Sequence, residues 1–541
     1  MSNNPLLHSH HIFLFPFKWS LNTSKEKPMS EKYDFSNIDT WQKSNPQWQR
    51  FKFERKSTGS YNSYNEYAYF HDYARDILSL DDDGSVTKRQ YSYTLAANVP
   101  QYIIQIKDTP DVFSLAIEDI VLNFYETGVG VLSFHLNNFS TVDFDSILKI
   151  NEYGRRIYPQ FLGFKDGEPL TLDTKYNFLS EKITLTGLTE NPIIEDFTHY
   201  DTWDNIQKQP FKLPNHIQSL LGNTFKVKSD AFVKGDIIIE PVIDDRMFTI
   251  CLYENTEMVK ILRGYDETKE LYNWQTSPEW HRFLFLDDSN ATCKSRNMIK
   301  KLLTDSTYDR WIENTDKQGN IEGHLYGVSR YSFMVIASKS WYLENVLINH
   351  IKNIYFQMTL LCLVQRASVL KYSGEVASII ENFEDESKTV NHITELYEYY
   401  IKFVNKIYFR EITPQEQGIE LYNLLQKQMD IERQVKELDA EIQELHSYIT
   451  FKQEQDRNGK LNRITYVGLP IAIASLVLSF FGLNYFGTGN DALKVDFTQR
   501  FTHANEPALS VWNTALIAFL FFIISLILLQ ISWKRLWKRF L

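Results

Sequence analysis

Arginines close to aromatic residues are the side chains with the clearest chemical potential in this sequence. Arg155 and Arg156 follow a predicted helix, Arg246 lies in a predicted tight turn, and Arg330 precedes Tyr331. Guanidinium groups bind phosphate through paired hydrogen bonds, and an aromatic ring offers a face for adenine. These residues are therefore candidate contacts for a small nucleotide. For each arginine the alternative is a structural salt bridge within an acidic domain.

A second group of candidates lies near the C-terminus. The amide oxygen of Asn484 could accept hydrogen bonds from hydrated Mg²⁺, an ion that sheds water reluctantly; a helix C-cap is the alternative. Small and weakly polar residues recur at helical spacing before it, and predict either a pore wall or close helix packing. They are Thr465, Gly468, Ala472, Ser475 and Ser479. Three acidic residues could concentrate cations or simply be solvated: Asp491, Asp496 and Glu506.

Other reactive combinations are weak. His8, His10 and His11 could bind a metal, although a flexible, partly exposed terminus is the simpler interpretation. The run from Asp81 to Ser85 lacks the full ligand set of a calcium loop and indicates a turn. No nucleophile elbow, P-loop, HExxH motif or Gly-rich dinucleotide turn is present, so we do not expect an enzyme.

Charge and cysteine content narrow the class of partner. The net charge is −11, and nine basic and three acidic residues follow position 456, so the first 456 residues carry −17. Sequence-independent nucleic-acid binding depends on neutralising phosphates, and this acidic body argues against it. The three cysteines lack metal-ligand spacing and suggest a reducing compartment.

Two long uncharged stretches dominate the C-terminal part, Ile464–Asn490 and Pro507–Trp533. About 20 apolar residues suffice to cross a bilayer, so both stretches predict transmembrane helices. Lys and Arg residues flank their inner ends, and no signal peptide is recognisable at the start. We therefore expect a multi-pass protein of the inner (plasma) membrane, with both termini cytoplasmic.

The expected fold class is an α/β cytoplasmic domain followed by long coiled-coil stalk helices and two C-terminal transmembrane helices. A hairpin turning at Gly128, a helix capped by Ser140–Asp143, and a second hairpin turning at Asp244–Asp245 indicate a mostly antiparallel sheet. His11–Trp19 is expected as an edge strand because of Pro16.

The pattern divides the chain into seven parts. We expect an α/β sensor at 1–340, a helical hairpin at 341–412, a stalk helix at 413–463, transmembrane helices at 464–486 and 509–533, an outer loop at 487–508, and a basic tail at 534–541. From Leu421 to Ile449, apolar residues follow the 3-4 spacing of a coiled coil, and one continuous helix is expected from Thr413 to Asn484.

Gly482-Leu483-Asn484, placed at the end of the penultimate span, resembles the Gly-Met-Asn motif of CorA-type divalent-cation transporters, with Leu483 replacing the usual methionine. Several segments look like the CorA-like proteins found beside type III CRISPR systems. These are His11–Trp19, Asn151–Pro159, Asp244–Phe248, Leu325–Tyr331, and Tyr355–Met358 with Gln365–Ser368.

The resemblance implies a homo-oligomer, a pentamer if the family pattern holds, that conducts divalent cations such as Mg²⁺ across a lipid bilayer. It also implies gating by an adenylate second messenger, SAM-AMP or a cyclic oligoadenylate, in antiviral defence. The alternatives are an ordinary transporter regulated by cytosolic Mg²⁺ and a non-conducting membrane-tethered receptor that disrupts the bilayer. Direct nucleic-acid binding is not expected.

Overall fold

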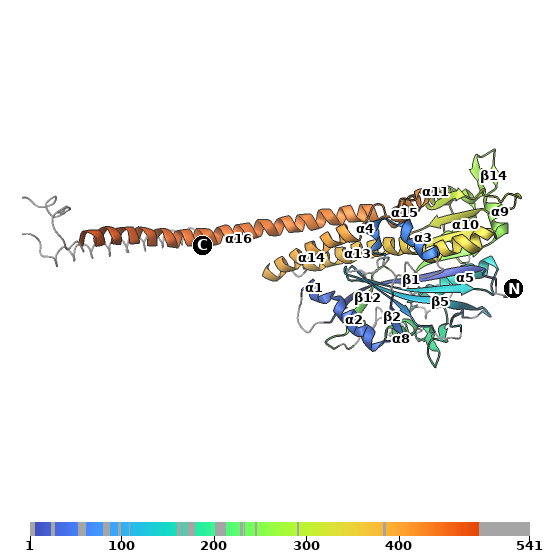
Figure 1. Ribbon diagram of the computed structural model, residues 1–541, viewed down its shortest axis with the longest axis horizontal. Helices are drawn as coiled ribbons and strands as arrows, with labels where there is room; N and C mark the ends of the chain where they lie inside the picture. Colours follow the sequence, from blue (N-terminus) through green and yellow to red (C-terminus); the bar gives the residue numbers. More distant parts are fainter. Residues whose placement is uncertain are drawn as a thin grey trace, which may run out of the picture. The chain divides into compact units, whose positions relative to one another are not determined.

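The computed structural model describes residues 6–485 apart from 23–27, 52–60, 79–86, 96–98, 108, 159–163, 166–167, 170–178, 201–212, 228–230, 232, 244–245, 289–291 and 382–385. The chain separates into two compact units, Met1–His446 and Ser447–Leu541. All strands among the described residues lie in the first unit (Figure 1). The predicted nucleotide contacts belong to the same unit.

A 14-stranded, mostly antiparallel sheet forms the centre of the first unit, as the sequence predicts. Its main path runs through ten strands in this spatial order: β10 (Ile193–Asp196), β9 (Lys182–Thr186), β4 (Gln101–Gln105), β5 (Val112–Tyr125), β6 (Val129–Asn138), β1 (Ser9–Leu21), β13 (Phe248–Glu254), β18 (Ser332–Ala337), β17 (His324–Val328) and β16 (Thr307–Trp311). Beside this path, β3 (Lys88–Tyr93) pairs with β5 and with β2 (Trp48–Arg50), and β12 (Ile237–Pro241) pairs with β1 and with β11 (Phe225–Lys226). Two small ribbons, β7 (Phe164–Lys165) with β8 (Glu168–Pro169) and β14 (Tyr265–Asp266) with β15 (Leu271–Tyr272), complete the strands.

Strand β1 is central, so the prediction of an edge strand is wrong. One side of β1 pairs with β6 from Ser9 to Lys18. The other side pairs first with β13, as far as Leu14, and then with β12, from Phe17 onward. Pro16 falls between these two partners, where its missing N–H leaves no ladder position empty. This placement explains how a proline is accommodated in a central strand.

The hairpin of β5 and β6 turns at Gly128, whose φ of 76° suits glycine, and confirms the first predicted hairpin. The second predicted hairpin is wrong. β12 and β13 do not pair with each other; they lie one after the other along the same side of β1. Strands that follow each other in sequence usually pair with each other, which is why a β12–β13 hairpin was expected. Here β1 is long enough to pair with both strands, and each pairs with β1 instead.

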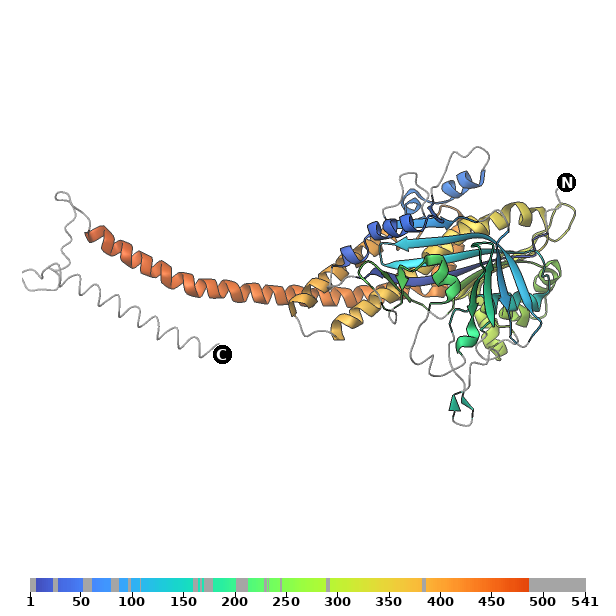
Figure 2. The same ribbon diagram turned by 90° about the horizontal axis from the view of Figure 1, so that it is seen from below.

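Helices cover the two faces of the sheet (Figures 1 and 2). Helix α5 (Phe144–Gly154) begins at Asp143, whose carboxylate accepts a hydrogen bond from Ser146 N, rather than at Ser140. His11 bonds Asn151 of α5, whereas its neighbour His10 lies by His135, which contacts Phe356 of α13 (Phe356–Glu381). Alternation along β1 therefore places α5 and α13 on opposite faces. The remaining helices of this region are α1 (Met29–Lys32), α2 (Phe35–Ser44), α3 (Tyr61–Tyr69), α4 (Asp72–Arg75), η1 (Phe197–Tyr200), α8 (Asn215–Leu221), α9 (Thr256–Leu262), η2 (Asn273–Thr276), α10 (Pro278–Phe285) and α11 (Arg296–Ser306).

The change to helical structure near Trp341 is confirmed. The chain is helical through η3 (Leu343–Leu347), α12 (Ile348–His350), η4 (Ile351–Tyr355) and α13, where η3 and η4 are π-helical turns. Helix α14 (Glu386–Lys406) follows, and then α15 (Glu416–Met429) and α16 (Ile431–Tyr485).

The expected continuous helix from Thr413 to Asn484 is interrupted. Asp430 has a φ of 58°, in the left-handed region, and separates α15 from α16. The apolar seam is largely buried within this one chain, with Val435, Leu438 and Ile442 at most 5% exposed. Tyr397 of α14 stacks on His446 of α16, which shows that α14 supplies part of this cover.

The membrane part of the expected fold class needs correction. Within the described residues, no helix is both long enough and apolar enough to cross a bilayer. The described side chains early in α16 include a charge at almost every turn, such as Arg433, Lys436 and Glu437, so this part of the helix is too polar to lie in a bilayer. The prediction of a membrane-spanning helix, and the inner-membrane localisation that rested on it, are therefore wrong for the described part of the chain. The outer loop, the second span and the basic tail, 487–541, lie outside the described residues.

Candidate functional site

Four of the five predicted ligand contacts, Arg155, Arg156, Arg246 and Tyr331, are brought together from segments far apart in sequence. The fifth, Arg330, precedes Tyr331 in the same turn. Arg155 and Arg156 follow α5 directly, and Arg156 forms an isolated antiparallel bridge with Arg246. The backbone N–H of Met247 donates to the carbonyl of Arg155 across 2.8 Å. This pairing fixes the end of α5 against the segment that enters β13, so three guanidinium groups meet at one end of that strand.

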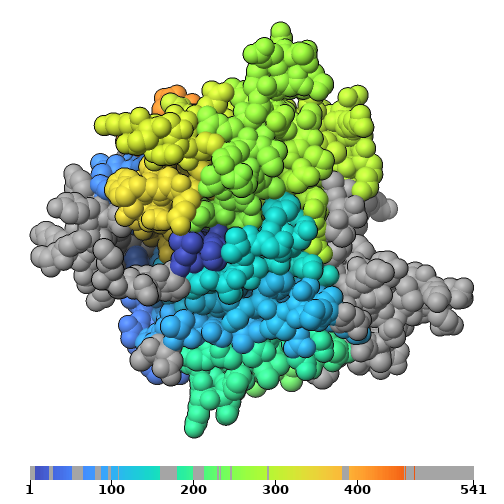
Figure 3. Space-filling model, turned by 90° about the vertical axis from the view of Figure 1, so that its right-hand side faces the viewer, coloured from blue at the N-terminus to red at the C-terminus, as the bar shows by residue number. Residues whose placement is uncertain are grey.

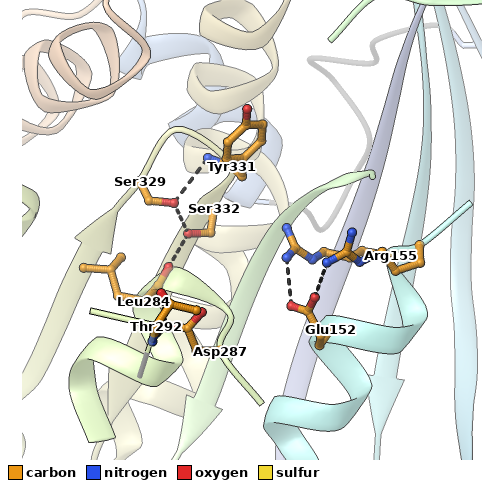
Figure 4. Close-up of polar contacts among 9 residues, drawn as sticks. Glu152, Arg155, Leu284, Asp287, Thr292, Ser329, Tyr331 and Ser332 are labelled. Atoms are coloured by element: carbon orange, nitrogen blue, oxygen red, sulfur yellow. Dashed lines mark hydrogen bonds and ion pairs between the residues drawn. The ribbon is translucent and has the colours of Figure 1, made fainter. Parts of the chain in front are cut away.

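Glu152 is the counter-charge of the inner arginines. Its carboxylate accepts hydrogen bonds from Arg155, at 2.8 Å, and from Arg156 (Figure 4). All three side chains are only 3–5% exposed. Burial by itself would raise the pKa of Glu152, but the two arginines outweigh it and lower that pKa. The salt-bridge alternative therefore holds for Arg155 and Arg156.

Arg155 keeps hydrogen-bonding capacity beyond that pair. Its Nε and Nη1 atoms have no hydrogen-bond partner among the described residues, although the side chain is buried. Burial lowers the pKa of Arg155; Glu152 opposes this effect, while the neighbouring Arg156 and Arg246 add to it. Buried donors without partners are rare and invite either water or a ligand.

Tyr331 links the inner arginines to the rest of the site. The guanidinium carbon of Arg246 lies 4.9 Å from the centre of the Tyr331 ring, and that of Arg366 lies 5.1 Å from it. Both distances are typical of cation–π contacts. Because the ring already contacts two guanidinium groups, its role here is to hold arginines in place. The expectation that it stacks against adenine is not supported by this geometry.

A tight turn between β17 and β18 presents Arg330 and Tyr331. Ser329 N donates to Ser332 O across 2.8 Å, and the two serine hydroxyls lie 2.6 Å apart. Ser332 also donates to the carbonyl of Leu284, which ties the turn to α10 (Figure 4). These bonds fix the backbone of the turn from which the side chains of Arg330 and Tyr331 extend.

Arg330 is the exposed member of the site. Its side chain is 47% exposed, and its Nη2 lies 3.6 Å from a carboxylate oxygen of Asp430. Its backbone carbonyl accepts a 2.7 Å hydrogen bond from Nη1 of Arg366, a residue of α13 that is 6% exposed. Sequence reasoning did not select Arg366 as a contact; a cation within an otherwise apolar helical stretch was the available signal.

We refer to Arg155, Arg156, Arg246, Arg330 and Arg366, with Tyr331, as the arginine cluster. Glu152 and Asp430 are its directly paired acids. Burial raises the pKa values of Asp287 and Asp288, and the nearby negative charge of Glu152 raises them further. Converging guanidinium groups with acids around them can bind a compact anion of defined shape, such as a phosphate diester, through directed N–H donors.

The predicted histidine site is not a metal centre. His10 and His11 are fully buried in β1, and burial lowers their pKa values to about 3 and about 4. Their Nδ1 atoms lie 2.7 Å from Asn137 and Asn151 respectively. The flexible terminus that we preferred is also wrong for these two residues. No group of three or more metal-ligating side chains occurs in the described part of the chain.

A cavity of about 430 Å³ lies at the opposite end of β13 from the arginine cluster. It is lined by Leu6–His10, Leu252, Glu254, Leu343–Asn345 and Ile348. Figure 3 shows this face, with the dark blue start of β1 beside the yellow helical segment. The cavity has no arginine in its lining and is therefore not the predicted site.

Cys251, His11 and Asn151 form a buried trio that superficially resembles a thiol protease arrangement. His11 and Cys251 are paired residues on β1 and β13, and both side chains are fully buried. Burial raises the pKa of Cys251 to about 12, against the smaller effect of its hydrogen bond with Asn151. A thiol with this pKa is a poor nucleophile, and the trio is structural.

The C-terminal candidates are placed only by their backbone. Thr465, Gly468, Ala472, Ser475, Ser479 and the motif Gly482-Leu483-Asn484 all belong to helix α16, which ends one residue after Asn484. Asp491, Asp496 and Glu506 lie outside the described residues. The roles predicted for these residues in ion selectivity stay predictions.

Comparison with known proteins gives one structural match to report. No protein-family model matches the chain, and no curated protein matches it. Among solved structures, the chain is similar to one described as the "structure of the full-length CmaX protein". The match covers 54% of this chain and 88% of that chain, with 13% identity and a TM-score of 0.17. Values this low carry no functional argument.

Proposed function

We propose that the first unit is a sensor for a small phosphate-bearing ligand, a nucleotide, which binds at the arginine cluster. The observation that carries this proposal is that Arg246 and Arg366 both contact the Tyr331 ring while the buried Arg155 lies close enough to Arg246 for their charges to interact. This happens within a part of the chain whose net charge is strongly negative. Glu152 is the one acid paired with Arg155 and Arg156 among the described residues, so the positive charge in this region exceeds the negative charge that is paired with it. Two further guanidinium groups lie against one ring, and two donors of Arg155 have no hydrogen-bond partner among the described residues.

The chemistry favours a compact, multiply charged ligand over a polymer. The acidic body repels an extended nucleic-acid backbone, whereas one or two phosphates can be enclosed by a few directed donors. The adenylate second messengers implied by the CorA-like resemblance, SAM-AMP or a cyclic oligoadenylate, fit this class. Because Tyr331 already contacts Arg246 and Arg366, recognition of the phosphate is the better supported part of the proposal.

Such a sensor would serve as the input of a switch in antiviral defence, the role that the resemblance implies. A ligand shifts a conformational equilibrium only by its difference in affinity for the two states, and a tenfold shift needs about 1.4 kcal/mol. Charge-assisted hydrogen bonds are worth about 1.5–3 kcal/mol each, so one or two suffice. We do not extend the proposal to ion conduction, since no helix in the described part of the chain is long and apolar enough to span a membrane.

Isothermal titration calorimetry on the purified full chain tests the proposal. Cyclic oligoadenylates and SAM-AMP are titrated separately, and Mg²⁺ alone is a further titrant. At least one adenylate compound should bind at micromolar concentration. Binding of Mg²⁺ with no adenylate binding would contradict the proposal and favour a Mg²⁺-regulated protein.

Two variants locate the site. Arg246→Gln should weaken binding about 10- to 100-fold, because it removes one charge-assisted contact while keeping a polar side chain. Arg310→Gln is the matched control, since Arg310 is 42% exposed and pairs with Glu420 outside the cluster. Equal affinity of the Arg246 variant and the wild type would show that the ligand binds elsewhere.

A further inference from the structure

The ion pair between Arg330 and Asp430 joins the arginine cluster to the break between α15 and α16. Asp430 is the residue with positive φ that ends α15, and its N–H bonds the carbonyls of Gln426 and Lys427. The buried residues on either side, Met429 and Ile431, are both 0% exposed and anchor the two helices. The break is therefore a defined joint between two packed helices, with a charged residue at its centre.

Asp430 has two competing cationic partners. Nε of Arg433, on the first turn of α16, donates to Asp430 across 2.9 Å, whereas Arg330 approaches only to 3.6 Å. Arg433 donates to Asp430 through both Nε and Nη2, whereas the 47% exposed Arg330 makes only the longer contact. The Arg330 pair is therefore the weaker of the two and the more easily exchanged. The longer contact is the one that connects the helical joint to the predicted ligand site.

The arginine cluster holds the Arg330 turn from the other side. Arg366 bonds the carbonyl of Arg330 and contacts the ring of Tyr331, and Thr249 N donates to the carbonyl of Tyr331 across 3.1 Å. The backbone at Arg330 is thus fixed, while its guanidinium group is free to turn through rotation of its own side chain. One guanidinium group cannot bind Asp430 and an incoming phosphate with full geometry at once.

We propose that Arg330 is a shared residue that pairs with Asp430 without ligand and with the ligand phosphate when it is bound. Release of Asp430 changes the angle between α15 and α16. This inference rests on the proposed function for its ligand, but the role of Asp430 in the joint can be measured without any ligand.

Distances between two spin labels report the joint directly. Labels are placed on cysteines introduced at two exposed positions, Asn423 of α15 and Glu437 of α16. The chain also carries Cys293→Ser, because Cys293 is the partly exposed native cysteine, whereas Cys251 and Cys362 are buried. Asp430→Asn keeps a residue that tolerates positive φ and removes the charge. Without ligand, this variant should shift the label distance distribution relative to the unsubstituted chain. An unchanged distribution would overturn the proposal, whatever the ligand does.

Arg433→Gln is the matched control, because it removes the other partner of Asp430 and leaves Arg330 in place. Its label distances should remain those of the unsubstituted chain. An equal shift in this variant would assign the joint to the Arg433 pair and overturn the role of Arg330.

The ligand measurements separate this inference from the proposed function. Asp430→Asn should bind the adenylate ligand about two- to fivefold more tightly, because ligand no longer competes with an exposed ion pair. The gain should vanish when Arg330→Gln is added. A second outcome is that ligand binds the cluster normally while neither ligand nor Asp430→Asn changes the label distances. That result would support ligand binding at the arginine cluster and overturn the role of Asp430 in the joint. If no adenylate binds, the sensor fails and the label result alone decides whether Asp430 holds the joint.

Discussion

The inner and outer parts of the arginine cluster contain the same residue type in opposite environments. Arg155 and Arg156 share Glu152 in a region that is 3–5% exposed, whereas Arg330 meets Asp430 at 3.6 Å with nearly half of its side chain in water. Buried charges are costly unless they are paired, so the inner arginines are held firmly. Exposed pairs contribute little and can change partner. Burial therefore separates a structural arginine from one that can respond to a ligand.

The largest expected effect comes from breaking the inner pair. Glu152→Gln leaves two buried guanidinium groups without their counter-charge, and we expect the free energy of unfolding to fall by about 3–5 kcal/mol. Urea denaturation followed by circular dichroism measures this change. A loss below 1 kcal/mol would mean that the inner arginines are solvated, and the comparison would fail.

The pH dependence of stability provides an independent test of how strongly burial disfavours charge in this fold, because it depends on the protonation of a buried histidine. His216 is fully buried, and burial lowers its pKa to about 3, well below the 6.5 of an unfolded chain. Between these values only the unfolded state is protonated, so stability falls as the pH drops below 6.5. Each pH unit costs about 1.4 kcal/mol for each such histidine.

His216→Leu removes this proton uptake. From pH 8 to pH 5 the free energy of unfolding of this variant should therefore fall by about 2 kcal/mol less than that of the wild type. Referring each protein to its own value at pH 8 removes the packing effect of the substitution. Identical pH dependence of the two proteins would show that His216 is not kept neutral by the fold.

The outer part should respond mainly through its backbone. Asp430→Ala and Asp430→Gly both remove the contacts to Arg330 and Arg433, but only glycine adopts a φ of 58° without strain. We expect the alanine variant to be less stable than the glycine variant by about 1–2 kcal/mol in thermal or urea unfolding. Equal stabilities would indicate that α15 and α16 merge into one helix once the aspartate is removed.

The smallest effect is expected at an exposed pair away from the cluster. Arg310→Gln breaks the ion pair with Glu420. The Arg310 side chain is 42% exposed and the Glu420 side chain is 36% exposed. The change in the free energy of unfolding should stay below about 1 kcal/mol and shrink further at 1 M salt. A larger loss would show that exposure alone does not predict the strength of ion pairs in this protein.

The sequence alone determined the features that depend on near neighbours in the chain. Gly128 predicted the turn of the β5–β6 hairpin because few residues other than glycine adopt its φ. The change of apolar period near Trp341 predicted the start of the helical segment. The spacing of arginines beside aromatic residues selected Arg155, Arg156, Arg246, Arg330 and Tyr331, four of which also lie around one another in space.

Tertiary structure decided everything that depends on which distant segment packs against which. The central position of β1 and the placement of β12 and β13 along the same side of it come from pairings across more than 200 residues. The contact of Arg366 with the Arg330 turn joins a helix to a turn that precedes it by 36 residues. A local pattern records the faces of an element but not its partner, since many partners would bury the same apolar face equally well. The same limit applies to charge: the sequence shows an arginine, and only the fold decides whether it is buried beside Glu152 or exposed beside Asp430.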